Sequence, residues 1–97
     1  MTLLLSPEFR KDVEDLSAPD RRRTRVALLE FRDKGQGDTR KVGEGLWRLR
    51  VGDYRIYYST REDDTYVLRL VHRSRAYRPE TIKTLLRRIA SLEGEDS

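Results

Sequence analysis

The chain has 97 residues, of which 39% are charged and 36% are hydrophobic, and its formal net charge is +4. This length predicts one small domain over residues 1–97, and we expect residues 93–97 to form a disordered tail. The sequence has no cysteine, which excludes disulfides and thiolate metal sites, and its single histidine excludes a multi-histidine metal site. We therefore expect no metal and no cofactor. No apolar run approaches the roughly 20 residues that span a bilayer, and no signal peptide is evident, so we expect a cytoplasmic protein without membrane contact.

The first predicted elements are a strand and a helical hairpin. Residues 2–5 form a short apolar run, which predicts a buried strand paired inside the sheet. Ser6 can cap a helix that has Pro7 at its first position. Apolar residues then recur at helical spacing, at Phe9, Val13 and Leu16. Residues 17–20 break this helix and start a second one, which ends near Gly35.

The rest of the chain predicts a sheet and a last helix. Strands are expected at about 39–42, 45–51, 54–60 and 64–72, with tight turns between the last three. Apolar residues at helical spacing between Ile82 and Leu92 predict the C-terminal helix. The fold class is therefore α+β, with an N-terminal strand and helical hairpin packed on a mostly antiparallel sheet.

Arginines alternate with apolar residues in these strands. Trp47 and Leu49 share one face of their strand, and Arg48 and Arg50 share the opposite face. Strict alternation sends Arg55 and Tyr57 to one face of the next strand, and Val67, Arg69, Val71 and Arg73 to one face of the third, away from His72. Such a cationic face beside tyrosines suits a nucleic acid, because arginine binds phosphate with two donors at once. The alternative is an ordinary solvated face of an antiparallel sheet. The second predicted helix begins with arginines at 21, 22, 23 and 25. These side chains either contact RNA or are ordinary solvent-exposed residues at the start of a helix.

Two segments carry a family resemblance: Trp-Arg-Leu-Arg-Val-Gly-Asp-Tyr-Arg-Ile at 47–56 and Val-His-Arg-x-x-x-Tyr at 71–77. They resemble the RelE/ParE toxin superfamily, and its RelE branch in particular. The resemblance implies a toxin of a type II toxin–antitoxin system that cuts mRNA in the decoding site of the ribosome. It also implies a cognate antitoxin as partner, in a toxin–antitoxin hetero-oligomer.

The resemblance also implies roles for single residues. Arg55 matches the phosphate-binding arginine, Arg73 the arginine that serves the leaving group or transition state, and Tyr77 the aromatic residue that stacks on a base. Arg48 and Arg50 match paired basic positions that hold lysines in well-studied members. They join Arg69 and Arg75 as candidate RNA-binding residues.

The proton acceptor stays open at this point. Arginine does not give up its proton, so Arg48 and Arg50 can bind phosphate but are poor general bases. His72 is a candidate because histidine titrates near neutral pH, although alternation turns it away from Arg73. Two other functions also stay open: a ParE-like toxin that binds DNA gyrase and cuts nothing, and an inactive RNA-binding family member. An antitoxin is expected to bind as an acidic segment, either covering the arginines or displacing the helix at 82–89.

Overall fold

The computed structural model describes residues 1–95, and the side chains of residues 1–91. Its elements follow in the order β1 (Thr2–Leu5), α1 (Pro7–Glu14), α2 (Ala18–Lys34), β2 (Asp38–Gly43), β3 (Leu46–Val51), β4 (Tyr54–Arg61), β5 (Asp64–His72) and α3 (Pro79–Glu95). This order confirms the predicted α+β fold class. None of the helices in the described residues is long and apolar enough to cross a membrane.

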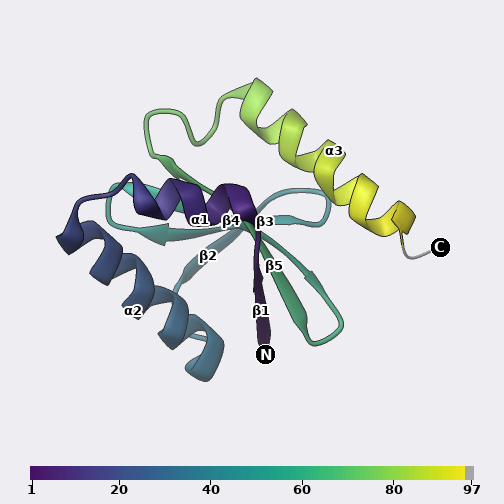
Figure 1. Cartoon of the computed structure of the whole chain (residues 1–97). Helices are drawn as coiled ribbons and strands as arrows, with labels where there is room; N and C mark the ends of the chain where they lie inside the picture. The colour runs from purple at the N-terminus through teal and green to yellow at the C-terminus, as the bar shows by residue number, and fades with distance from the viewer. Residues whose placement is uncertain (96–97) are drawn as a thin grey trace.

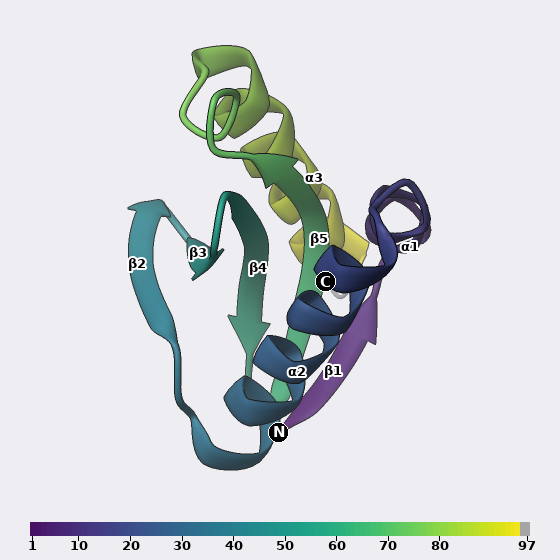
Figure 2. The same cartoon turned by 90° about the vertical axis from the view of Figure 1, so that its left-hand side faces the viewer.

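The five strands of the described chain form one sheet in the order β1-β5-β4-β3-β2 (Figure 2). Strands β2 to β5 are antiparallel neighbours, whereas β1 runs parallel to β5. The predicted pairing of this strand inside the sheet is confirmed by its ladder with β5, but the prediction that the strand is buried was wrong, because β1 lies at the edge. Leu3 and Leu5 pack on the core, but Leu4 is 41% exposed.

Local signals at the helix ends position the hairpin as predicted. The hydroxyl of Ser6 accepts the backbone N–H of Phe9 at 3.0 Å and donates to the carbonyl of Leu68 at 2.7 Å, which fixes α1 against β5. Ser17 caps α2 in the same way, and Gly35 ends α2 with a φ of 64°, a backbone conformation that favours glycine.

Two cores lie on opposite faces of the sheet, one under the hairpin and one under α3 (Figure 1). The hairpin core contains Phe9, Leu16, Leu28, Phe31, Leu49, Val51, Ile56, Tyr58, Val67 and Leu70. The α3 core contains Leu46, Tyr57, Leu68, Ala76, Leu85 and Ile89. Helix α3 runs on to Glu95, so residues 93–95 are helical where a tail was expected, and residues 96–97 lie outside the described part.

A β-bulge in β5 breaks the predicted strict alternation. Tyr57 pairs with Arg69, and the next residue, Tyr58, pairs with Val67, so Leu68 is the extra residue. Val67 therefore belongs to the hairpin core, while Leu68 belongs to the α3 core and Arg69 shares the face of Tyr57. The prediction that Val67 and Arg69 share a face was wrong for this reason.

An ion pair links α3 to α1 and predicts a pH dependence of stability. Nη2 of Arg88 lies 2.7 Å from Oε2 of Glu8, and this hydrogen bond lowers the pKa of Glu8 from 4.5 to about 2. A lowered pKa stabilises the fold above pH 4.5, and this stabilisation is lost as the pH falls from 4.5 to about 2. The thermal midpoint of Glu8→Gln should therefore lie below that of the wild type above pH 4.5, and the two should converge near pH 2.

The matched control is Glu14→Gln, an exposed glutamate of the same helix, which should follow the wild type across this range. Parallel pH profiles for the wild type and Glu8→Gln would show that the link to α3 does not stabilise the protein.

Candidate nucleic-acid interface

Four neighbouring arginines of β2, β3 and β4 lie on the face of the sheet that α3 covers in part. Arg48 of β3 is paired with Tyr57 of β4, and Arg50 is paired with Arg55. Arg40 of β2 is paired with Arg48, so it points to the same side. We call Arg40, Arg48, Arg50 and Arg55 the arginine cluster. Arg40 and Arg50 are exposed, whereas Arg48 and Arg55 are each only 8% exposed.

Arg48 lies between β2 and the loop that leads to α3. Its Nη1 donates to the carbonyl oxygen of Asp38 at 2.8 Å and to the Oδ1 of Asp38 at 3.2 Å. Its Nε donates to the hydroxyl of Tyr77 at 3.1 Å. Burial opposes the charge of Arg48, but the hydrogen bonds to Asp38 and Tyr77 outweigh it and raise the pKa of this guanidinium. Arg48 is therefore a fixed positive charge directly beneath Tyr77.

Arg55 is held near the start of β4, and one of its donors is buried without a partner in the described part of the chain. Its Nη1 donates to the carbonyls of Gly52 at 3.0 Å and Tyr54 at 2.9 Å. Its Nε is buried and has no hydrogen-bond partner among the described residues. An unpaired donor on a buried cation is unfavourable, and a phosphate oxygen is an acceptor that would satisfy it.

Tyr77 is the exposed member of the site, at 53% exposure, in the loop between β5 and α3. The loop is anchored next to it, because Ala76 is fully buried in the α3 core and the hydroxyl of Tyr57 donates to the carbonyl of Ala76. Burial raises the pKa of Tyr57 to about 12, so Tyr57 stays protonated and keeps this bond. A chain folded in this way presents the Tyr77 ring to solvent above Arg48.

His72 lies on the other face of the sheet from this site, and Arg73 lies at the turn between β3 and β4 that also holds Arg55. His72 is paired with Tyr54, on the hairpin side, and their rings meet edge to face at 5.5 Å between centroids. Its Nδ1 accepts the backbone N–H of Ser74 at 3.2 Å. Strand β5 ends at His72, and the backbone N–H of Arg73 donates to Asp53 at 2.7 Å, at the turn between β3 and β4. Arg73 is thus exposed at the end of the sheet, with its Nε 3.7 Å from the Oδ1 of Asp53.

Arg69 and Arg75 lie where α1 approaches α3. Both line a cavity of about 430 Å³ between α1 and α3. Nε and Nη2 of Arg69 donate to the Asp12 carboxylate at 2.7 and 3.0 Å, and the same carboxylate accepts the backbone N–H of Leu70 at 2.9 Å. Sequence reasoning missed Asp12, because a pair 57 residues apart leaves no local signal.

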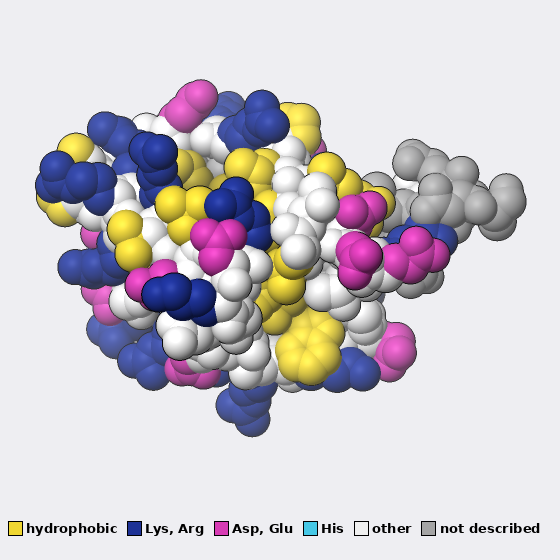
Figure 3. Space-filling model, turned by 90° about the horizontal axis from the view of Figure 1, so that it is seen from below, with side chains coloured by type: hydrophobic (Ala, Val, Ile, Leu, Met, Phe, Trp, Pro, Cys, Tyr) yellow, Lys and Arg dark blue, Asp and Glu magenta, His cyan; other side chains and the backbone are white. Residues whose placement is uncertain are grey.

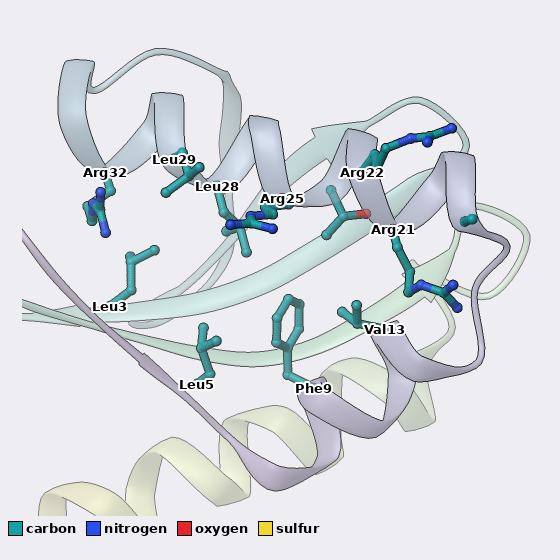
Figure 4. A pocket seen from close by; sticks show the side chains of 12 residues that line it. Leu3, Leu5, Phe9, Val13, Arg21, Arg22, Arg25, Leu28, Leu29 and Arg32 are labelled. Atoms are coloured by element: carbon teal, nitrogen blue, oxygen red, sulfur yellow. The ribbon is translucent and has the colours of Figure 1, made fainter.

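A second surface was also missed: an apolar groove of about 650 Å³ between α2, α1 and β1 (Figure 4). Its apolar lining includes Leu3, Leu5, Phe9, Val13, Leu28 and Leu29. Four arginines of α2 stand along it: Arg21, Arg22, Arg25 and Arg32. On the face shown in Figure 3, hydrophobic side chains reach the surface between basic ones on the hairpin side. The described residues contain no group of three or more side chains that could hold a metal ion.

One protein family matches this chain in sequence. Its model, described as the ParE toxin of the type II toxin–antitoxin system parDE, matches residues 3–77. No curated protein sequence matches the chain.

Solved structures share the fold. The chain is 25% identical to a protein in the RelB–RelE antitoxin–toxin complex of Methanococcus jannaschii, with 76% of this chain and 94% of that chain covered and a TM-score of 0.65. The archaeal RelE–RelB complex of Pyrococcus horikoshii OT3 gives 26% identity, 77% and 97% coverage, and a TM-score of 0.66. The isolated E. coli RelE toxin, at 16% identity, 91% and 97% coverage and a TM-score of 0.61, shows likeness of fold alone.

Proposed function

Because this chain belongs to the ParE toxin family of type II toxin–antitoxin systems, within the RelE/ParE superfamily, we propose that it is an endoribonuclease that cuts mRNA on the ribosome. The observation that carries the proposal is the pair of buried guanidinium groups, Arg48 and Arg55, beside the exposed ring of Tyr77. The spare Nε–H of Arg55 suits a phosphate oxygen, and an exposed aromatic ring suits a base.

Metal-free RNA cleavage uses the 2′-hydroxyl of the substrate as nucleophile. The reaction needs in-line geometry, a proton acceptor and positive charge around the phosphorus. We assign the scissile phosphate to Arg55, with Arg48 as a second fixed charge. Arg40 and Arg50, exposed on the same face, are assigned to neighbouring phosphates, and Arg73 and Arg75 to the RNA that leaves the site.

The ribosome enters this proposal as the holder of the substrate. The arginine cluster supplies charge, and a rigid partner that holds the mRNA supplies the in-line geometry that a flexible RNA does not keep on its own. The test is primer extension on an mRNA that is being translated, with and without ribosomes, in the presence of purified protein. We expect new 5′ ends only with ribosomes. Efficient cutting of ribosome-free RNA, or no cutting in either reaction, would contradict the proposal.

A ParE-like gyrase inhibitor is the second candidate. It is favoured by the family model that matches residues 3–77 and by the arginines at 48 and 50, where well-studied ribonuclease members carry lysines. Inhibition of DNA supercoiling by purified gyrase, with translated mRNA left intact, would select this function.

We further infer that the groove of Figure 4 receives an acidic amphipathic helix of the cognate antitoxin. Its apolar floor fits the apolar face of such a helix, and its four arginines complement carboxylates along the edges of that face. The C-terminal helix is less suited to displacement, since Leu85 and Ile89 are 3% and 5% exposed and form part of a core.

Leu29→Glu tests the groove. Leu29 lines it and is 38% exposed, so the variant should fold, but a carboxylate there meets both an apolar surface and an acidic partner. We expect antitoxin affinity, measured by calorimetry, to fall at least about tenfold. The matched control is Val26→Glu, on the same helix and 53% exposed but outside the groove, which should bind normally. Equal affinities for the two variants would place the antitoxin elsewhere.

A further inference from the structure

A two-residue turn, Gly52–Asp53, joins β3 to β4 and holds two of the arginines that we assign to RNA. The carbonyl of Gly52 accepts a hydrogen bond from Nη1 of Arg55 at 3.0 Å. The carbonyl of Asp53, the next residue, accepts the backbone N–H of Arg73 at 2.7 Å. Arg55 is itself paired with Val71, two residues before Arg73. The turn is therefore the place where β4 and the end of β5 bring these two arginines together.

The turn is held in a fixed conformation. Gly52 has a φ of 58°, a backbone conformation that favours glycine. A Cβ at this position would lie 3.0 Å from Nη1 of Arg23, so a side chain of α2 packs against the turn. Contacts with α2, β4 and the end of β5 therefore fix the backbone from which the Asp53 side chain projects.

The carboxylate of Asp53 acts on Arg73 through charge. Its Oδ1 lies 3.7 Å from Nε of Arg73, which is too long for a hydrogen bond but close enough for an ion pair. Both side chains are exposed, at 64% for Arg73 and 66% for Asp53, so RNA can reach the guanidinium. The guanidinium donates no hydrogen bond to the described residues, so its donors stay available to phosphate. An ion pair that restricts a long side chain before RNA arrives lowers the entropy cost of binding.

We propose that Asp53 is a positioning residue of the cleavage site, a role that rests on the proposed ribonuclease function. Arg55 binds the scissile phosphate, Arg73 binds the RNA that leaves the site, and Asp53 sets the spacing between the two guanidinium groups. Asp53 acts only through Arg73, because a carboxylate repels phosphate and does not contact it directly.

This role predicts an effect opposite in sign to that of simple electrostatics. Removing a carboxylate from an RNA-binding surface makes the surface more positive, which by itself strengthens RNA binding. We expect Asp53→Asn instead to slow single-turnover cleavage of ribosome-bound mRNA by about fivefold, the upper range for an exposed ion pair. The ribosome concentration that gives half the maximal rate should not rise, because no positive charge is lost. Asparagine is as common in turns as aspartate, so the variant should fold, which circular dichroism checks.

Three further variants separate positioning from a general effect on the fold or on surface charge. In an Arg73→Ala background, Asp53→Asn should cause no additional loss of rate, because the side chain that it positions is absent. Asp53→Glu keeps the charge and should recover part of the rate. The matched control is Asp63→Asn, which makes the same change in the exposed turn at the other end of β4 and should cleave at the wild-type rate.

Cleavage by Asp53→Asn at or above the wild-type rate would overturn this inference. The same loss of rate with and without Arg73, an equal loss in Asp63→Asn, or no recovery in Asp53→Glu would also overturn it. In each of these cases the wild-type protein still cuts, so the ribonuclease function would stand. Wild-type protein that leaves translated mRNA intact would overturn the proposed function and this inference with it.

Discussion

Replacing Arg55 with methionine is expected to slow the cleavage of ribosome-bound mRNA by about 10²–10³. Methionine keeps an unbranched side chain in the buried position but removes the charge and the spare Nε–H that we assign to the scissile phosphate. Arg55→Lys should recover only part of the rate, because an ammonium group keeps the charge and loses the planar arrangement of donors. Rates are measured in single turnover by primer extension.

Stability has to be measured beside the rate, because the sequence predicts Arg55 on a solvated face and the structure buries it. Its Nη1 donates to the carbonyls of Gly52 and Tyr54, so Arg55→Met should lower the free energy of unfolding by about 1–3 kcal/mol. Arg87→Met removes an exposed arginine of α3 and should leave both quantities unchanged. A folded Arg55→Met protein that cuts at the wild-type rate would refute the assignment of Arg55 to phosphate.

Ile56→Ala is expected to have the largest effect on stability, a loss of about 2–5 kcal/mol in the free energy of unfolding. Ile56 is 0% exposed in β4 and packs in the hairpin core, while its neighbour Tyr57 faces the α3 core. A cavity at Ile56 therefore weakens the central strand that also carries Arg55. Because small domains are stable by only about 5–15 kcal/mol, this loss is a large fraction of the total.

Urea unfolding followed by circular dichroism measures this loss. Val26→Ala is the matched control, since Val26 is 53% exposed on α2 and should change the free energy of unfolding by no more than about 0.5 kcal/mol. Similar losses in the two variants would mean that the hairpin core does not hold the sheet together.

Short-range features of this fold are predictable from sequence. Ser6 and Ser17 cap their helices, Gly35 ends α2, and the predicted range 64–72 coincides with β5. Each of these features depends on a few neighbouring residues. A serine hydroxyl caps a helix by accepting the N–H three positions later, and a strand shows apolar residues at every second position. The alternation of β3 likewise predicts correctly that Arg48 and Arg50 share a face.

Long-range features are not predictable in this way. The edge position of β1 depends on its pairing with β5, and an apolar run looks the same at an edge and in the middle of a sheet. The bulge at Leu68 inserts one extra residue into β5, so that residues before it, such as Val67, point to the opposite face from the one that strict alternation predicts. The alternating pattern of the sequence does not reveal where such a residue is inserted. Burial of Arg55 and the contact of Arg48 with Tyr77 arise because the loop after β5 folds back over β3.

The most direct measurement of the central claim, that the RNA attacks itself at the arginine cluster, uses two mRNAs on programmed ribosomes. One is all ribose, and the other has a single 2′-deoxynucleotide at the cleaved position. With wild-type protein, we predict that the first is cut and leaves a 2′,3′-cyclic phosphate, and that the second stays intact at that position. Equal cutting of both mRNAs would contradict this claim. An all-ribose mRNA that stays intact, while the same protein inhibits DNA supercoiling by gyrase, would also contradict it.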